Sequence, residues 1–287
     1  MTEAAPAGMA QPAVSGIVIC RDAGEGLRAT LASLAFCDER VVLDSGSTDG
    51  SPELARSLGA RVEHQPFLGY GPQKRHAVAL ARHDWILSLD ADEVLDETAT
   101  AAIRTLSLDD PRASYAWRRR TFVGTREIRH GPWGGERVIR LFNRRVADFT
   151  PFPVHERVVA PRRTTLLPGS ILHHSFPTLA DVISRSVRYA RPKAAMIRAA
   201  DERPRAWALP ARAAAAFFKA YLIQSGWRDG AAGMVIALSR SIDSVLPRAL
   251  VILDDDRADH PPRSAASKAV MSSGSGASTT IRDPDVG

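Results

Sequence analysis

Trp85-Ile86-Leu87-Ser88-Leu89-Asp90-Ala91-Asp92-Glu93 is the stretch that decides the fold class. Its mostly apolar beginning predicts a buried strand, and a cluster of acids follows at once. Asp90, Asp92 and Glu93 repel one another at this spacing unless a cation or a ligand hydroxyl offsets their charge. In an α/β protein, a strand that ends in such a cluster predicts a site for a divalent metal and a phosphorylated ligand.

The residues before this stretch alternate between strand and helix patterns. We predict strands over 14–20, 41–43, 60–64 and 85–89, and helices over 27–34, 52–58 and 74–82. This alternation predicts βαβ units and a parallel sheet, in which ligands bind at the carboxyl ends of the strands. Asp22, Asp44 and Asp90 each follow a predicted strand, so we expect them to meet on one edge.

The rest of the chain gives the predicted domain organisation. Between about Ser114 and His174 the pattern is mixed, with strands predicted over 115–120, 138–142 and 156–159. From Leu179 onward apolar residues recur at helical spacing, interrupted at Pro192, and a last helix is predicted from Ala231 to Leu246. The predicted parts are a disordered N-terminus at 1–13, an α/β domain at 14–175, a helical extension at 176–253 and a disordered tail at 254–287.

Composition limits the function classes. The chain has 287 residues, 45% of them hydrophobic, which is typical of a globular protein with a real core. Its net charge of +6 favours partners that carry phosphate, and because no nucleic-acid-binding motif accompanies the charge we expect no nucleic acid. The beginning of the chain lacks a signal-peptide pattern, and no apolar run is long enough for a membrane span. We therefore expect a cytoplasmic protein that contacts, at most, the cytoplasmic face of the inner membrane.

Two motifs carry candidate chemistry. Asp90 and Asp92, two residues apart at a strand end, suit Mg²⁺ or Mn²⁺, which prefers oxygen ligands and bridges to substrate phosphates. The competing interpretation is a solvated acidic turn that caps the next helix. In the second motif, Val41-Val42-Leu43-Asp44-Ser45-Gly46-Ser47-Thr48-Asp49-Gly50, Asp44 is the better ligand contact because it is fixed at the strand end. Asp49 is equally explained as a helix cap.

These motifs together resemble a known family. VVLDSGSTDGS at 41–51, followed by WILSLDADE at 85–93, resembles the nucleotide-sugar-binding half of family 2 glycosyltransferases, which have a GT-A fold. GYGPQKRHAVALARHDW (69–85), FVGTREIRHGPW (122–133), RLFNRR (140–145) and PVHERV (153–158) resemble the lipopolysaccharide core β-glucosyltransferase subgroup, which is WaaE/KdtX-like. The resemblance implies a Rossmann-like, mostly parallel sheet flanked by helices, with a helical C-terminal extension.

The resemblance also implies an activity and its residues. It implies a metal-dependent inverting glycosyltransferase that moves a sugar, with UDP-glucose as the expected donor, onto a lipid-linked lipopolysaccharide core acceptor. The implied nucleotide-sugar contacts are Asp22, Asp44, Lys74, Arg75 and Asp90; the implied Mg²⁺ or Mn²⁺ ligands are Asp92, Asp90 and His155; the implied base is Glu156, with Glu93 as its rival. One departure is Ala23, where relatives often carry an acid.

Several alternatives stay open. The acceptor could belong to a capsule, an exopolysaccharide or another lipid-linked glycan, or the chain could bind a nucleotide sugar without catalysis. The basic residues Arg118–Arg120, Arg137, Arg140, Arg144 and Arg145 suit a phosphorylated acceptor or form a solvated face. The segment 205–227 suits an anionic membrane surface or packs on the main domain. We interpret His173-His174 as structural.

Overall fold

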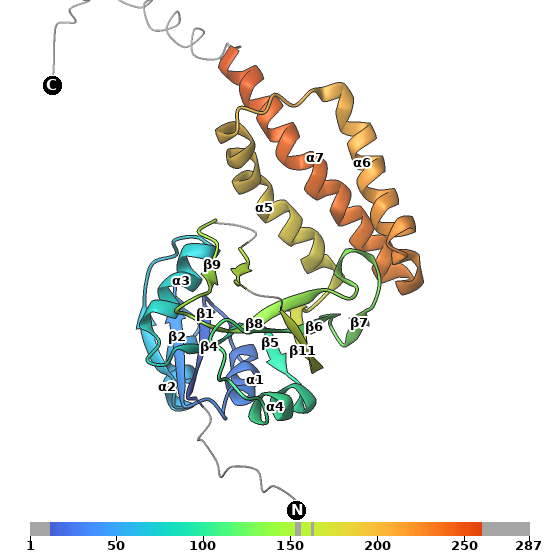
Figure 1. Cartoon of the computed structure of the whole chain (residues 1–287). Coiled ribbons are helices and arrows are strands. Elements are labelled where there is room, and N and C mark those ends of the chain that lie inside the picture. Colours follow the sequence, from blue (N-terminus) through green and yellow to red (C-terminus); the bar gives the residue numbers. More distant parts are fainter. Residues whose placement is uncertain (1–11, 153–155, 162–163, 260–287) are drawn as a thin grey trace, which may run out of the picture. The chain divides into compact units, whose positions relative to one another are not determined.

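The computed structural model describes residues 12–152, 156–161 and 164–259, and its architecture is mixed α/β (Figure 1). The first half of the chain alternates strands with helices. The strands are β1 (Val14–Cys20), β2 (Glu39–Asp44), β3 (Arg61–His64) and β4 (Trp85–Asp90), and the helices are α1 (Gly26–Ser33), α2 (Ser51–Ser57) and α3 (Tyr70–Leu80). These strands lie parallel in the order β3-β2-β1-β4, as the alternation predicts.

Both faces of this parallel part are buried. Val18 and Leu87 point to the face covered by α1 and α2. Ile17 and Ile86, one residue earlier in each strand, point to the face covered by α3. Because successive strand residues alternate between the faces, a sheet covered on both sides requires nearly continuous apolar strands, which is the pattern seen in the sequence.

Further strands extend the sheet beyond β4, with antiparallel pairs except for β11, which lies parallel to β6. They are β5 (Glu93–Leu95), β6 (Ser114–Val123), β7 (Arg126–Ile128), β8 (Arg137–Asn143) and β11 (Thr165–Phe176), with α4 (Glu97–Arg104) after β5. The order continues β4-β8-β6-β11-β5, with β7 on β6, and β9 (Asp148–Phe149) pairs with β10 (Val158–Val159) in a separate small sheet. Glu93 is thus the first residue of a strand, whereas the competing interpretation of the acidic cluster was a solvated turn.

The C-terminal helices contain two prolines, of which we expected Pro192 to interrupt the helical pattern. They are α5 (Leu179–Ala199), α6 (Leu209–Phe218) and α7 (Ala231–Asp259). Pro192 lies inside α5 and Pro247 inside α7, so α7 continues past the predicted end at Leu246. Ala194 and Val251, which follow these prolines, are buried, and such packing offsets the helix-breaking cost.

The chain divides into two compact units. The first comprises the residues up to Ile183 together with Phe218–Leu238, and the second comprises Ser184–Phe217 with the residues from Ser239 on. Within the first unit, Phe176 and Val182 pack against Ile236 in an apolar cluster. This grouping cuts across the boundary predicted at residue 176, because the start of α7 packs with the sheet.

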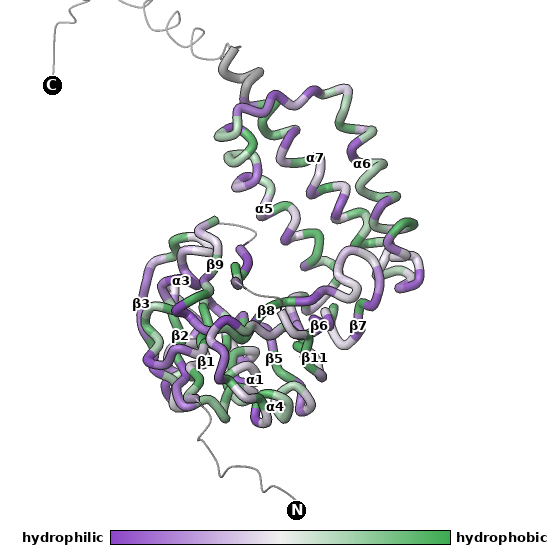
Figure 2. The backbone as a smooth tube through the Cα atoms, in the orientation of Figure 1, coloured by the Kyte–Doolittle hydropathy of each residue, from purple (hydrophilic) through white to green (hydrophobic). Residues whose placement is uncertain are grey.

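The helices α5, α6 and α7 alternate between hydrophobic and hydrophilic stretches along their length (Figure 2). Over the described part of the chain, no helix is both long and apolar enough to cross a membrane.

Candidate active site

Three acids lie at the carboxyl edge of the parallel strands. Asp44 ends β2 and Asp90 ends β4, and β1 lies between these two strands. Asp22 follows β1, and its Oδ1 accepts a hydrogen bond of 2.7 Å from the Thr48 amide. The structure therefore brings these three predicted site residues to one edge, because parallel strands present their carboxyl ends together.

The Asp44 carboxylate stabilises the turn that follows it. It is buried, and it accepts hydrogen bonds from the Gly46 amide (2.9 Å) and from the Ser47 hydroxyl (2.5 Å). Burial alone would raise the pKa of Asp44, but the hydrogen bonds from Ser47 and Gly46 outweigh it and hold the pKa below its usual value. Gly46 has a φ of 92°, a conformation that a side chain would strain.

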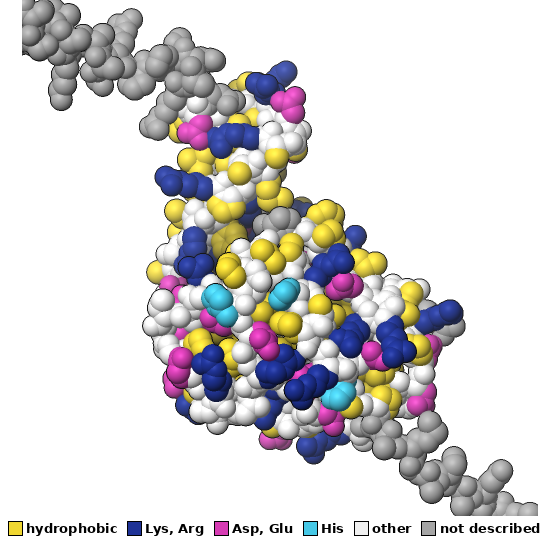
Figure 3. Space-filling view, turned by 90° about the vertical axis from the view of Figure 1, so that its left-hand side faces the viewer, with side chains coloured by type: hydrophobic (Ala, Val, Ile, Leu, Met, Phe, Trp, Pro, Cys, Tyr) yellow, Lys and Arg dark blue, Asp and Glu magenta, His cyan; other side chains and the backbone are white. Residues whose placement is uncertain are grey.

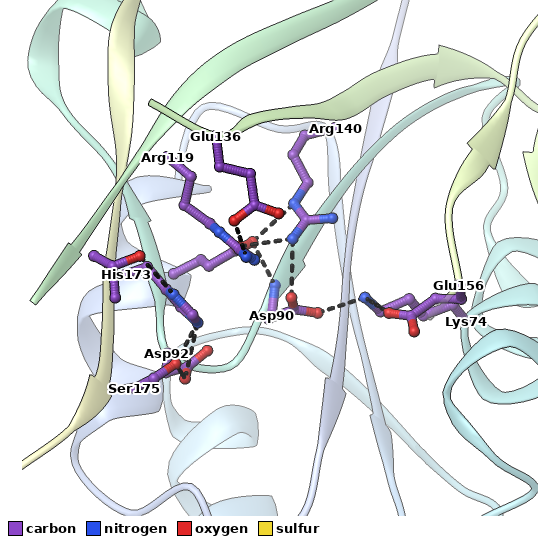
Figure 4. A network of polar contacts seen from close by, with 11 residues as sticks. Lys74, Asp90, Asp92, Arg119, Glu136, Arg140, Glu156, His173 and Ser175 are labelled. Carbon is purple, nitrogen blue, oxygen red and sulfur yellow. Dashed lines mark hydrogen bonds and ion pairs between the residues drawn. The ribbon is translucent and has the colours of Figure 1, made fainter. Parts of the chain in front are cut away.

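Lys74 joins two of the predicted residues. Its ammonium lies 2.7 Å from Asp90 Oδ1 and 2.7 Å from Glu156 Oε1, and its side chain is only 3% exposed (Figure 4). Close packing of α3 makes this possible: a Cβ on Gly71 would stand 2.3 Å from the Thr150 carbonyl oxygen, so only glycine fits there. Lys74 thereby holds Glu156, distant in sequence, beside the acids of β4.

A bulge in β8 aims Arg140 at the same acids. In the ladder with β6, Leu141 pairs with Tyr115 and Ile139 pairs with Ala116, so Arg140 is the extra residue. Bulges redirect side chains in this way and are frequent beside active sites.

Arg140 and Glu93 form a buried ion pair. Arg140 donates to Glu93 Oε2 (2.8 Å) and Oε1 (2.6 Å), and also to Asp90 Oδ2 (2.9 Å). Burial alone would lower the pKa of Arg140, but Glu93 and Asp90 outweigh it and raise the pKa. Glu93 is fully buried, and Arg119 approaches its Oε1 at 3.4 Å while also pairing with Glu136. Both oxygens of Glu93 are therefore engaged by arginine.

Asp92 is the most open member of the cluster. Its side chain is 42% exposed, and only Oδ2 has side-chain partners among the described residues: the Ser175 hydroxyl at 2.6 Å and His173 Nε2 at 3.4 Å. Burial alone would raise its pKa, but the contacts with His173 and Ser175 hold the pKa below its usual value. Asp92 Oδ1 therefore remains available to a ligand.

A divalent cation fits this end of the cluster in part. Asp90 has both oxygens in ion pairs with Lys74 and Arg140, whereas Asp92 offers Oδ1. The ring nitrogens of the neighbouring His173 contact Thr121, Ser175 and Asp92 Oδ2. Within the described residues, no group of three His, Cys, Asp or Glu side chains forms a metal site. Asp92 Oδ1 suits a cation that takes its other ligands from phosphate oxygens and water, as Mg²⁺ does.

The family of the chain follows from a family-wide comparison. The model described as Glycosyl transferase family 2 matches residues 15–163, just over half of the chain. The chain belongs to glycosyl transferase family 2. Its matched residues include β1 to β10 and with them Lys74, the β4 acids and Arg140.

Curated relatives agree with this assignment. The glycosyltransferase is 26% identical over 246 residues to the lipopolysaccharide core biosynthesis glycosyltransferase LpsC of Rhizobium meliloti (strain 1021), which covers 83% of this chain and 91% of the relative. It is 26% identical over 237 residues to an uncharacterized glycosyltransferase of Rickettsia bellii (strain RML369-C), covering 77% and 80%. A solved structure of glucosyl-3-phosphoglycerate synthase from Mycobacterium tuberculosis, with Mn²⁺, UDP and glucosyl-3-phosphoglycerate, overlaps 42% of this chain and 51% of its own at 21% identity and a TM-score of 0.32.

Most arginines of the predicted basic patch are in ion pairs in the glycosyltransferase. The pairs are Arg119 with Glu136 (2.5 Å), Arg120 with Glu127 (2.8 Å), Arg144 with Asp84 (3.4 Å) and Arg145 with Asp84 (2.7 Å), beside the Arg140 pairs. On the face drawn in Figure 3, basic side chains likewise lie among acidic ones rather than in one continuous patch. Only Arg118 and Arg137 of the predicted set are exposed and have no ion pair among the described residues.

Three other residues complete the comparison with the sequence. Arg75 pairs with Asp148 at 3.1 Å and not with the acid cluster. His155 lies outside the described residues. His173, which we interpreted as structural, contacts Asp92 because β11 pairs with β5, with His173 opposite Glu93. No local pattern in the sequence indicates that β11 pairs with β5, so the contact of His173 with Asp92 could not be predicted.

Proposed function

We propose that this glycosyltransferase moves a hexose, with glucose from UDP-glucose as the expected donor, onto a lipid-linked lipopolysaccharide core acceptor, with inversion at the anomeric carbon. The role of the Rhizobium meliloti relative in lipopolysaccharide core biosynthesis and the motif order of the sequence support this choice of acceptor. The observation that carries the proposal is that Lys74 links Asp90 to Glu156, beside the exposed Asp92.

In the proposed donor site, Asp44 contacts the uracil and Asp90 lies toward the ribose. Asp92, positioned by His173 and Ser175, would hold a divalent cation, which when bound offsets the charge that develops on the leaving diphosphate. Asp90 is already fixed by Lys74 and Arg140, so this part of the site is ordered before the donor binds. Such preorganisation reduces the cost of binding.

Glu156 is the proposed general base. Its carboxylate takes the proton of the acceptor hydroxyl while that oxygen forms a bond to the anomeric carbon and the bond to the diphosphate breaks, releasing UDP. Lys74 binds only Oε1 of Glu156, and among the described residues Oε2 has no hydrogen-bond partner. The second oxygen is therefore the one proposed to accept the proton.

Thermal unfolding with nucleotide sugars tests the donor and the metal together. We expect UDP-glucose with Mn²⁺ to raise Tm by several degrees, corresponding to about 2.7 kcal/mol at a ligand concentration of 100 times Kd. GDP- and dTDP-sugars, or UDP-glucose without a metal, should give a much smaller rise. Asp92→Asn should abolish the Mn²⁺-dependent part, whereas Asp109→Asn, at an exposed loop acid, should keep it. Equal stabilisation with and without metal would refute the cation site.

We also propose contact with an anionic membrane surface through the segment between α6 and α7. Leu222 (52% exposed), Ile223 (79%) and Trp227 (54%) lie there beside the exposed Lys219 and Arg228. Apolar and tryptophan side chains with basic neighbours suit a lipid interface. Ile223→Asp should reduce co-sedimentation with phosphatidylglycerol vesicles, whereas Val146→Asp, in the turn after β8, should not. Equal sedimentation of all three proteins would refute this contact.

A further inference from the structure

Two arginines face each other across the β6–β8 ladder. Arg118 pairs with Arg137 in the antiparallel register, and both side chains are exposed. Residues directly opposite in such a ladder project to the same face with their Cβ atoms about 5 Å apart, and like charges at these positions are destabilising. The fold therefore bears an electrostatic cost at this place.

The neighbouring arginines are arranged differently. On β6, Arg119 pairs with Glu136 and Arg120 pairs with Glu127. Arg140 on β8 is matched by two carboxylates. The chain thus supplies an acid wherever an arginine on these strands is structural, yet in the described part of the molecule it supplies none to Arg118 or Arg137.

The pair stands next to the candidate active site. Arg137 is three residues from Arg140, which reaches Asp90 and Glu93. Arg118 directly precedes Arg119, which contacts Glu93. Because successive strand residues point to opposite faces, Arg118 and Arg137 project instead to the face of Ile139, which α3 covers. On the other side of β6, Arg118 is in register with Ser170 of β11, so a hydroxyl-bearing residue flanks the pair.

We propose that Arg118 and Arg137 form a subsite for a phosphate group carried by the acceptor saccharide, close to the hydroxyl that receives the sugar. Two planar guanidinium groups match a phosphate, because each can donate two parallel hydrogen bonds to its oxygens. A bound phosphate also relieves the repulsion between the two arginines. The inference rests on the proposed function, since it assigns this subsite to an acceptor, and it narrows the acceptor to a phosphorylated sugar.

Phosphate binding can be measured without sugar transfer, so its outcome is independent of whether the proposed donor is correct. We would follow Tm with inorganic phosphate, glucose 6-phosphate, glycerol 3-phosphate or acetate at matched ionic strength, with UDP and Mn²⁺ present and absent. Inorganic phosphate and the hexose phosphate should each raise the Tm of the native protein by about 2–4 °C. In the double variant Arg118→Gln/Arg137→Gln this rise should fall to less than half.

The ligand-free variants separate a binding role from a structural one. Removal of the repulsion should leave the Tm of the double variant equal to the native value or about 1–3 °C above it. A matched variant, Arg56→Gln/Arg145→Gln, loses the same charge at two exposed arginines and should keep the full phosphate effect. The same phosphate-dependent rise in all three proteins would overturn the proposal. So would stabilisation by glycerol 3-phosphate but not by the hexose phosphate, which would indicate a lipid headgroup, or a preference for acetate.

Discussion

The strand β2 begins and ends with a buried acid, and the two ends differ in what surrounds them. At the first end, Glu39 accepts hydrogen bonds from the Ser15 hydroxyl (2.8 Å), the Arg82 amide (2.8 Å) and Arg61 Nη2 (2.8 Å). At the other end, Asp44 belongs to an edge that also carries Asp90, Asp92 and Glu156. The first end is closed, because partners from the chain occupy both oxygens of its acid.

The carboxyl end keeps some oxygens open despite its greater charge. Lys74 and Arg140 engage both oxygens of Asp90, yet Asp92 Oδ1 and Glu156 Oε2 have no partner among the described residues. An acid that serves only the fold has no need of an open oxygen, since partners at all positions stabilise it more. The contrast indicates that Asp92 and Glu156 are held in place for a ligand.

Glu156→Gln should have the largest effect of the substitutions, because it changes the proposed base at the carboxyl end of the strands. The amide still accepts a hydrogen bond from Lys74 but cannot take a proton, so kcat should fall about 10²- to 10⁴-fold. Affinity for UDP should change little, because the backbone and the donor contacts remain. Steady-state kinetics with a UDP binding titration would measure both quantities.

Glu63→Gln is the matched control for that experiment. Glu63 is a partly exposed acid on the edge strand β3 that pairs with Arg61, and its variant should keep native turnover. If Glu156→Gln retained a kcat within threefold of native, the base would have to be another residue.

Glu93→Gln tests whether Glu93, the rival base, stabilises the fold instead of taking part in catalysis. Glu93 is fully buried and both its oxygens bind Arg140, so removal of its charge leaves the buried Arg140 with Asp90 as its one carboxylate partner among the described residues. Breaking a buried pair in this way costs about 3–5 kcal/mol, which corresponds to a fall of about 10 °C in Tm. Thermal unfolding by circular dichroism would show it.

Glu136→Gln provides the comparison for Glu93. Glu136 also pairs with Arg119 but is 40% exposed, so its loss should cost less than about 1 kcal/mol. A Glu93→Gln protein with native Tm and lost turnover would instead make Glu93 the base.

The sequence was sufficient for the parallel strands β1 to β4 but not for the mixed part of the sheet that follows them. The strand and helix alternation that precedes Asp90 is local, and each element could be located from its own residues. The bulge at Arg140 and the pairing of His173 with Glu93 depend on contacts between distant segments, which local patterns do not record. The same limit applies to Lys74, whose link to Glu156 spans 82 residues.

The candidate residues also differ in whether local sequence patterns could predict their surroundings. Asp44 and Asp90 could be placed on one edge because strand ends meet there in any parallel sheet. The ion pairs that occupy Glu93 could not be foreseen, because an arginine-rich stretch gives no sign of which members meet acids. Arg120, for example, pairs with Glu127 across the β6–β7 hairpin and not with any predicted site residue.

Glu39→Gln should have a smaller effect than Glu156→Gln or Glu93→Gln, and that effect should depend on pH. Burial alone would raise the pKa of Glu39, but hydrogen bonds from Arg82, Arg61 and Ser15 outweigh it and lower the pKa. A carboxylate with a lowered folded pKa stabilises the fold above its unfolded pKa of about 4.3, and that contribution is lost as pH falls through the folded value. At pH 7 the variant should be about 1–3 kcal/mol less stable than the native protein. In urea unfolding between pH 7 and pH 3, the difference in unfolding free energy between the native protein and the variant should shrink as the pH falls. A difference that stayed constant would show that the charge of Glu39 does not stabilise this end of β2.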